Sequence, residues 1–266
     1  MAVTTVKVGT LEYLSADNIP VPHCFTTRLG GVSQGYLASL NLGMHRGDAP
    51  ENVAANFGIL ADALGFDLNS LVLTRQIHSH IVRQVCSADS CGFDNHDYPE
   101  CDALITDQPG TALAVFSADC TPVLLFDPVT GAVGAAHAGW RGTAAKIAAK
   151  TAEAMAQAFG SRPEQLCAAI GPNIGQCCFE TDADVPYAML DAFGEQAKAY
   201  IKQVNDKYYV NLKGLNALQL QAMGITSIAI SSECTACRTD RFWSHRVMGG
   251  KRGSQGAIIV CKGVCL

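Results

Sequence analysis

Apolar residues occur along this chain in short runs, some with the alternation typical of strands and others with helical spacing. The runs that predict strands are 5–14, 23–27, 71–85, 102–106, 123–126, 132–136, 166–170, 208–212, 227–231 and the pair 242–247 with 257–261. Helical spacing marks a segment that ends at Gly65, then 144–159, 182–202 and 215–223. Because strands and helices are mixed without a regular βαβ alternation, the pattern favours an α+β fold with antiparallel sheets.

Two of these runs, 123–126 and 132–136, predict a hairpin because turn-forming residues separate them. A four-residue loop that sets Phe126 opposite Gly131 also sets Cys120 opposite His137. Directly opposed residues have Cβ atoms about 4.5–5.5 Å apart on one face. The register therefore predicts a thiol and an imidazole that converge on one metal ion or one proton. The alternative is that Cys120 is a small core residue, as free cysteines often are.

Polar and bulky residues crowd the end of this hairpin, where a plain strand end would need none. Asp119 precedes the cysteine, and Trp140-Arg141-Gly142 follow the histidine. Thr143 is a suitable N-cap for the helix 144–159. The free N–H groups of that helix predict an anion site beside His137.

Further metal-ligand candidates lie outside the hairpin. Alternation along 71–85 puts His78 and His80 on one strand face, and either residue is a candidate third ligand. A separate site at Cys91, His96 and Cys101 is an alternative that their wide spacing disfavours. The Cys234-Thr-Ala-Cys237 pair is interpreted as structural, because no second cysteine pair stands nearby in sequence for zinc.

Composition limits the classes of function. The 266 residues are 48% hydrophobic, which is ample for a core, and carry a formal charge of -5 with a pI near 5.8. This charge argues against nucleic acid as a partner. No apolar stretch reaches the roughly 18 residues that span a bilayer, and the first residues do not resemble a signal peptide. We therefore expect a cytoplasmic protein with no membrane partner, whose 12 cysteines are reduced.

Several motifs together resemble the laccase-domain family, historically called multicopper polyphenol oxidoreductases and now interpreted as purine nucleoside phosphorylases with adenosine deaminase activity. They are Phe25-Thr26-Thr27-Arg28 with Gly30-Gly31-Val32-Ser33, Ser39-Leu40-Asn41-Leu42-Gly43 with His45 and Gly47-Asp48, Gln76-Ile77-His78, Ala118-Asp119-Cys120-Thr121-Pro122, His137-Ala138-Gly139-Trp140-Arg141-Gly142, and Ile170-Gly171-Pro172 with Glu180. The resemblance implies a single domain over 1–266 with a four-layer α/β/β/α sandwich. It also implies a metal site made of His78, Cys120 and His137. The chain departs from the family at Phe57, where arginine is frequent, and at 242–246, where the aromatic run differs.

The historical name does not agree with the histidine content. A multicopper laccase needs a blue-copper centre and a trinuclear cluster fed by four His-x-His pairs, whereas this chain has 7 histidines and the single pair His78/His80. Two histidines and a cysteine with one open position are instead typical of catalytic zinc, which lowers the pKa of bound water to about 7. We expect zinc, with copper as a possible substitute because it binds most nitrogen and sulfur sites more tightly.

The leading functional expectation is phosphorolysis of a purine nucleoside, with adenosine deamination at the same site. The expected partners are therefore a purine nucleoside and phosphate. Candidates for phosphate are Arg46 and Arg141, and candidates for the nucleoside are Asn41 and Glu180.

Three alternatives stay open at this stage. One is a cysteine hydrolase or deamidase with Cys120 as nucleophile and His137 as base. The others are a copper-dependent polyphenol oxidoreductase and a zinc-stabilised binding module without enzymatic activity. The sequence leaves the oligomeric state open and is compatible with a monomer.

Overall fold

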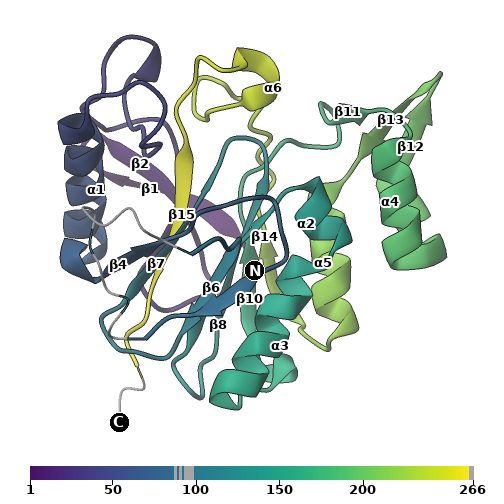
Figure 1. Cartoon of the computed structure of the whole chain (residues 1–266), viewed down its shortest axis with the longest axis horizontal. Helices are drawn as coiled ribbons and strands as arrows, with labels where there is room; N and C mark the ends of the chain where they lie inside the picture. The colour runs from purple at the N-terminus through teal and green to yellow at the C-terminus, as the bar shows by residue number, and fades with distance from the viewer. Residues whose placement is uncertain (87–88, 90–91, 93–98, 264–266) are drawn as a thin grey trace.

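Two six-stranded sheets form the centre of the structure, a computed structural model that describes residues 1–86, 89, 92 and 99–263 (Figure 1). The first sheet contains β1 (Val3–Val8), β2 (Leu11–Ala16), β3 (His23–Thr26), β15 (Gln255–Val260), β7 (Ala112–Ser117) and β4 (Leu71–Leu73), in that order. The second contains β14 (Ser227–Ile230), β10 (Cys167–Ile170), β8 (Thr121–Phe126), β9 (Val133–Ala138), β6 (Ala103–Thr106) and β5 (Val82–Gln84). Most pairings are antiparallel, and β4–β7, β5–β6 and β10–β14 are parallel. The predicted mixed, largely antiparallel sheets are confirmed.

Six α-helices, short 3-10 helices and a small sheet complete the described elements. The helices are α1 (Pro50–Leu64), α2 (Trp140–Ala144), α3 (Ile147–Phe159), α4 (Asp184–Phe193), α5 (Leu212–Ala222) and α6 (His245–Met248). The small sheet has the order β11 (Glu180–Thr181), β13 (Lys207–Val210), β12 (Ile201–Val204). It lies beside α4 and away from the two large sheets (Figure 1).

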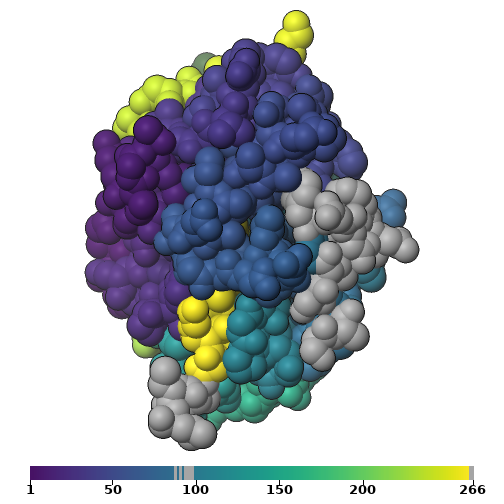
Figure 2. Space-filling model, turned by 90° about the vertical axis from the view of Figure 1, so that its left-hand side faces the viewer, coloured from purple at the N-terminus to yellow at the C-terminus, as the bar shows by residue number. Residues whose placement is uncertain are grey.

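Strand alternation sorts the apolar side chains into three interior layers. In β7, Leu113 and Val115 face the second sheet, whereas Ala112 and Ala114 pack under α1. In β8, Leu124 lies between the sheets, and its neighbours on either side pack against α3 and α5. The layers are therefore α1, the first sheet, the second sheet, and α3 together with α5. This order confirms the predicted α/β/β/α sandwich. The space-filling view from the side of α1 shows blue segments over this face, with a yellow patch from near the C-terminus beside a teal segment below them (Figure 2).

The central hairpin forms, but in a register that differs by two residues from the prediction. Phe126 pairs with Val133, and His137 pairs with Pro122 rather than Cys120. The N–H of Asp127 donates to the carbonyl of Ala132 at 2.9 Å, so the loop is 128–131. A slip of two residues keeps each side chain on its face. The predicted convergence of Cys120 and His137 therefore survives the wrong register.

The helix predicted over 144–159 is two helices instead. Lys146 has a left-handed backbone (φ 61°) and separates α2 from α3. Thr143 is not an N-cap, because it lies inside α2, fully buried, where its hydroxyl accepts a hydrogen bond from Asn216. The predicted anion site at the start of 144–159 is therefore wrong.

Three other predicted elements differ. Residues 74–81 form a loop between β4 and β5 rather than continuous strand, so strand alternation does not place His78 and His80. The segment 182–202 holds α4, a 3-10 turn from Gly194 to Tyr200 and the start of β12. Residues 245–248 are helical, so 242–247 does not pair with β15 as a hairpin. In the alternative metal site, Cys91 and His96 lie outside the described residues.

Candidate metal centre and its cavity

His78, Cys120 and His137 come together where the central hairpin meets the loop 74–81. One ligand atom from each lies within 4.8 Å of the other two. The Cys120 sulfur is 3.9 Å from Nε2 of His78, and the two imidazole rings meet edge to face with centroids 4.9 Å apart. His137 is buried and His78 is exposed, so the cluster is covered by protein on the side of His137 and open to solvent on the side of His78.

Asp102 is a buried carboxylate that organises this cluster from behind. Its Oδ1 lies 2.8 Å from Nδ1 of His137 and accepts the His78 N–H at 3.1 Å. Its Oδ2 accepts from the N–H and hydroxyl of Ser79, each at 2.7 Å, and from the Ile77 N–H at 3.2 Å. The carboxylate thereby fixes the ring of His137 with Nε2 free for a ligand, as second-layer carboxylates do in metal sites. It also explains why 74–81 leaves the strand conformation, since its N–H groups bond to a side chain.

Backbone strain is concentrated beside the ligands. His78 and Asp119 have positive φ angles, 59° and 91°, which non-glycine residues rarely adopt. Such residues cost about 1–3 kcal/mol each and persist only where the surroundings hold them. Asp119 is held by Thr235, Ser244 and the N–H of Arg246, at 2.6, 3.1 and 2.7 Å from its carboxylate. The fold therefore fixes the backbone just before Cys120.

Gly139 has no side chain, and its absence makes room for the side chains of His78 and Cys120. A Cβ atom at this position would lie 3.0 Å from Cδ2 of His78 and 3.2 Å from the Cys120 sulfur. Both contacts are tighter than ordinary van der Waals packing, and the hairpin holds the backbone on one side. The glycine of the His-Ala-Gly-Trp-Arg-Gly motif is therefore required by the close approach of the two ligands.

The Cys120 thiolate and the His137 imidazolium stabilise one another. Burial alone would raise the pKa of the Cys120 thiol, but the charge of His137 and hydrogen bonds to His137 and His78 lower it to about 6. Burial opposes the His137 imidazolium, yet the Cys120 charge and the bond to Asp102 raise its pKa to about 9. At neutral pH the thiol is therefore ionised, which is the form that ligates metals and acts as a nucleophile.

A cavity of about 660 Å³ opens in front of the three ligands. The residues lining it are Leu42, Gly43, Met44, His45, Arg46, Thr74, Arg75, Gln76, His78, Phe116, Ser117, Ala118, Cys120, His137, His245, Arg252 and Ser254. This size suits a drug-sized or nucleoside-sized ligand. Arg252 is nearly buried. Its burial, and then repulsion from the nearby charge of Arg46, lower its pKa to about 10. These two guanidinium groups make the cavity suitable for an anion.

The structure brings some predicted residues to this cavity and places others elsewhere. Arg46 lines it. Asn41 is fully buried behind it, where its amide bonds to Asp48, Gly43 and the N–H of Ser254 and so shapes the wall. Arg141 is exposed and stacks on Trp140, with 4.1 Å from its guanidinium carbon to the ring centroid. Glu180 is exposed on β11 and accepts a 2.6 Å hydrogen bond from the Tyr209 hydroxyl.

Sequence reasoning missed Asp102, Arg252 and His245. Asp102 immediately precedes a strand, where a carboxylate next to apolar residues is a usable signal. His245 begins α6 and Arg252 lies in the loop before β15, and both reach the cavity only through the fold, so no local pattern marks them.

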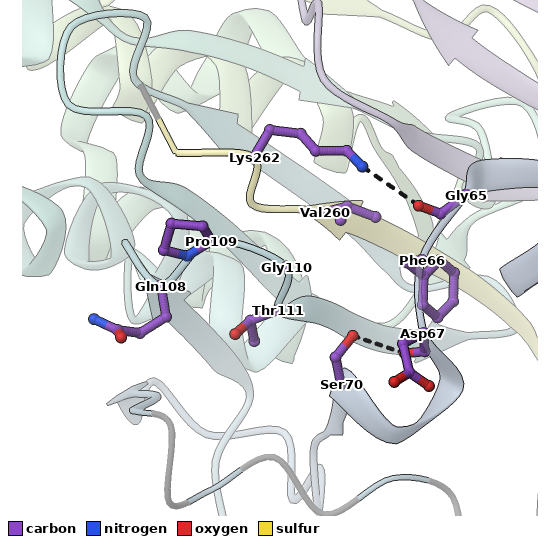
Figure 3. Close-up of a pocket in the computed structure, with 10 residues that line it drawn as sticks. All are labelled: Gly65, Phe66, Asp67, Ser70, Gln108, Pro109, Gly110, Thr111, Val260 and Lys262. Carbon is purple, nitrogen blue, oxygen red and sulfur yellow. Dashed lines mark hydrogen bonds between the residues drawn. The ribbon is translucent and has the colours of Figure 1, made fainter. Parts of the chain in front are cut away.

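A second cavity of about 400 Å³ lies at the other end of the first sheet (Figure 3). It lies between the turn after α1 and the segment 108–111, and Lys262 donates to the carbonyl of Gly65 across it at 3.3 Å. Its lining contains no histidine or cysteine. It therefore offers none of the chemistry that the first cavity holds. Within the described part of the chain, no helix combines the length and apolar character needed to cross a membrane.

Comparison with known proteins finds relatives over nearly the whole chain. The profile of the family described as multi-copper polyphenol oxidoreductase laccase matches residues 22–262. A purine nucleoside phosphorylase of Deinococcus radiodurans is 40% identical over 250 residues, 94% of this chain and 92% of that protein. Purine nucleoside phosphorylase YlmD of Bacillus subtilis is 35% identical, over 97% and 95% of the two chains.

Solved structures are similar over nearly the whole chain. The crystal structure of YlmD from Geobacillus stearothermophilus has a TM-score of 0.89 at 33% identity, with 97% of this chain and 98% of that one covered. The hypothetical protein YfiH of Bacillus licheniformis also has a TM-score of 0.89, at 35% identity, with 96% and 98% covered.

Proposed function

Because this chain belongs to the multi-copper polyphenol oxidoreductase laccase family, in which relatives carry the name purine nucleoside phosphorylase, we propose that it cleaves purine nucleosides with phosphate. The observation that carries this proposal is that one cavity is lined by His78, Cys120 and His137 and also by three arginines, Arg46, Arg75 and Arg252. We further propose that the same site deaminates adenosine.

His78, Cys120 and His137 fit a zinc ion. Two imidazole nitrogens and one thiolate are the donors that catalytic zinc takes from proteins, with a position left for substrate or water. The carboxylate behind His137 and the space left by Gly139 fit the same role. A bound zinc ion would supply Lewis-acid chemistry to groups in the cavity. Copper fits the same donors and remains a possible substitute.

The chain's own residues would orient the two substrates. Arg46 and Arg252 would hold the phosphate by charge-assisted hydrogen bonds, since both line the cavity and one is nearly buried. Asn41 would keep the cavity wall in shape through its bonds to Gly43 and Ser254. Arg141 and Glu180 stand outside the cavity lining, so we assign Arg141 no direct contact with phosphate and Glu180 none with the nucleoside.

The test is to incubate the zinc-loaded protein with adenosine, inosine, guanosine and a methylthio analogue, with and without phosphate, and to identify products by mass spectrometry. We expect inosine from adenosine without phosphate, and free base with ribose 1-phosphate only when phosphate is present. Cys120→Ala should remove both activities. Phosphorolysis that persists in a metal-depleted Cys120→Ala protein would contradict the proposal.

A second candidate function is a cysteine hydrolase with Cys120 as nucleophile and His137 as base, and the lowered pKa of Cys120 favours it. The two candidates differ in the state of the thiol. A metal-free protein whose Cys120 reacts rapidly with iodoacetamide would support the hydrolase. A tightly held zinc ion and a protected thiol would support the phosphorylase.

The copper-dependent oxidation of polyphenols, implied by the historical family name, is checked in the same preparations. The copper-loaded protein is supplied with a phenol, and oxygen uptake is recorded. Because the described metal cluster has two histidines and one cysteine, we expect no four-copper activity. A zinc-stabilised binding module would instead lose its fold on metal removal and turn over no nucleoside.

A further inference from the structure

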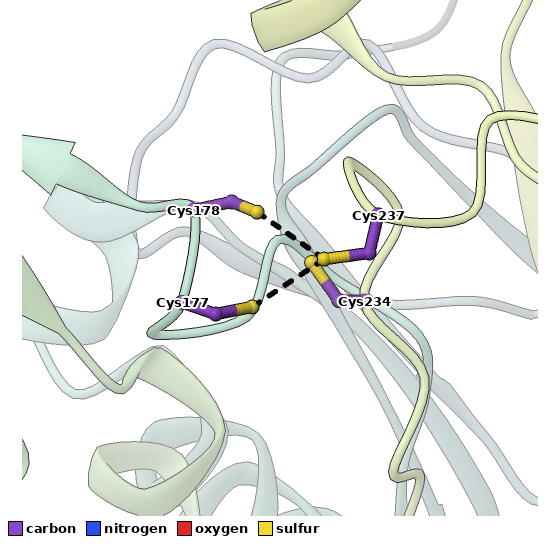
Figure 4. Close-up of side chains that lie close together, drawn as sticks. All are labelled: Cys177, Cys178, Cys234 and Cys237. Carbon is purple, nitrogen blue, oxygen red and sulfur yellow. Dashed lines mark hydrogen bonds between the residues drawn. The ribbon is translucent and has the colours of Figure 1, made fainter.

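Four cysteines from two distant loops converge outside the proposed catalytic cavity. Cys177 and Cys178 lie in the loop between β10 and β11, and Cys234 and Cys237 lie in the loop after β14. Their sulfur atoms all lie within 4.8 Å of one another, and Figure 4 shows the four side chains pointing toward a common centre. The sequence interpretation of Cys234 and Cys237 as a pair without a partner for zinc is therefore wrong, because the fold supplies Cys177 and Cys178.

The spacing of the sulfur atoms matches a tetrahedral thiolate site. Zn–S bonds of about 2.3 Å place the sulfurs of such a site about 3.8 Å apart. The Cys237 sulfur lies 3.6 Å from that of Cys177 and 3.3 Å from that of Cys178. Both distances are far longer than the roughly 2.05 Å of a disulfide bond. The cysteines are therefore free thiols, poised at nearly the separation that one metal ion requires.

The surroundings of Cys234 are adapted to a thiolate. Its sulfur accepts a hydrogen bond from the Gly175 N–H at 3.1 Å and another from the Cys237 N–H. Gly175 also has no room for a side chain, since a Cβ would lie 3.2 Å from the Cys177 sulfur and 3.3 Å from that of Cys234. N–H groups aimed at sulfur stabilise its ionised form, which is the form that binds metal.

A buried ammonium group supplies opposite charge beside the cluster. Lys213 is 9% exposed, and its Nζ donates to the carbonyls of Ser231 and Glu233, next to Cys234 in the chain. Its charge acts on both Cys234 and Cys177. Four thiolates around a divalent ion carry a net charge of about -2, which a buried cation partly neutralises.

We propose that Cys177, Cys178, Cys234 and Cys237 bind one structural zinc ion, in addition to the metal held by His78, Cys120 and His137. A closed four-cysteine set leaves no position for substrate, which is typical of structural rather than catalytic zinc. The proposal does not depend on the activity of the cavity.

The placement of the second site gives it a mechanical role. Asn173 in one loop and Cys234 in the other form an isolated parallel β-bridge. The N–H of Ile174 donates to the carbonyl of Asp119 at 2.9 Å. Thr235, next to Cys234, donates to the Asp119 carboxylate at 2.6 Å. The four-cysteine site therefore fastens the two loops that hold the backbone preceding Cys120.

The experiment is a zinc count per chain by plasma mass spectrometry, on protein purified under reducing conditions without chelator. We expect two zinc ions for wild type, one each for Cys120→Ala and Cys237→Ser, and none for the double variant. Cys86→Ser changes an exposed cysteine away from both sites and is the matched control, with two zinc ions expected.

Cobalt substitution of the Cys120→Ala protein keeps the proposal testable if Cys237→Ser does not fold. That protein retains all four cluster cysteines, so its thiolate-to-cobalt charge-transfer absorption should have the intensity of a four-thiolate centre. No zinc in Cys120→Ala, a zinc count in Cys237→Ser equal to that of wild type, or iron in place of zinc would overturn the proposal. So would a disulfide between the two cysteine pairs, found by non-reducing peptide mapping.

Discussion

Replacing Asp102 with asparagine tests the role assigned to the carboxylate behind the metal site. Asp102 accepts from His137 and His78 on one oxygen, and from Ile77 and Ser79 on the other. An amide presents an acceptor on one side only. If the NH₂ group faces Ile77 and Ser79, two backbone N–H groups lose their acceptor, and if it faces His137 and His78, the His78 N–H loses its acceptor. If the NH₂ faces His137, Nδ1 of the ring becomes an acceptor, and the proton moves to Nε2, the nitrogen needed for the metal.

The structure gives the size of the effect. Each donor left without an acceptor costs about 1–3 kcal/mol, so one or two such donors lower the free energy of unfolding by about 1–6 kcal/mol. Loss of an orienting carboxylate typically weakens metal binding about 10–100-fold, which is about 1.4–2.8 kcal/mol. We expect both effects in Asp102→Asn, the first in the metal-free protein and the second in the zinc dissociation constant.

The pH dependence of stability carries a third signature of Asp102. Burial opposes its ionisation, but hydrogen bonds from His137 and Ser79 lower its pKa from 3.8 to about 2. A carboxyl group whose pKa is lowered by folding stabilises the folded state at every pH above its ordinary pKa. That stabilisation is lost as the pH falls toward 2, the pKa in the folded state. The difference corresponds to about 2 kcal/mol. In Asp102→Asn this part of the acid dependence should be absent.

The assay combines urea unfolding of metal-free protein with zinc competition against a chromophoric chelator. Asp127→Asn is the matched control, because Asp127 is equally buried and accepts the Val129 and Thr130 N–H groups at the far end of the same hairpin. Because both N–H groups bond to one oxygen, an amide at this position can keep them, and Asp127→Asn should leave zinc affinity unchanged. Wild-type zinc affinity in Asp102→Asn, or an equal loss in Asp127→Asn, would refute the assignment.

Three further predictions concern the cavity and the ligands. Arg252→Gln should lower phosphorolysis at least 10-fold while deamination continues, and Arg141→Gln should change neither, as steady-state assays with and without phosphate would reveal. In metal-free protein, alkylation of Cys120 by iodoacetamide should rise with pH around a midpoint near 6, because the thiolate forms above its lowered pKa; a midpoint near 9 would contradict the pairing with His137. Gly139→Ala should displace a ligand and weaken zinc binding at least 10-fold, whereas Gly160→Ala, where nothing lies within 4 Å, should leave zinc affinity unchanged in the same competition assay.

Local pattern predicted most of the elements of this protein and its mixed, largely antiparallel class, whereas the layer order came from the resemblance to a known family. The continuous apolar run 123–126 requires burial on both strand faces, and the helical spacing of Val53, Phe57, Leu60 and Leu64 requires one apolar stripe. Two sheets with helices on their outer faces satisfy both requirements. The resemblance to a known family added His78 to the pair Cys120 and His137, which the hairpin alone had predicted.

Tertiary structure decided what depended on contacts between distant segments. The hairpin register depended on where the loop closed at Asp127, and the helix break depended on Lys146, neither of which hydrophobic spacing resolves. Asp102 reached His137 across paired strands, and Arg252 reached the cavity from the end of the chain.

The four-cysteine cluster is the clearest case of this difference. Cys177 and Cys178 stand in one loop and Cys234 and Cys237 in another, and each pair alone has too few ligands for a closed zinc site. Sequence spacing measures distance along the chain, whereas a metal site requires proximity in space. The parallel pairing of β10 with β14 supplies that proximity, because it sets the loops that follow these two strands at the same edge of the sheet.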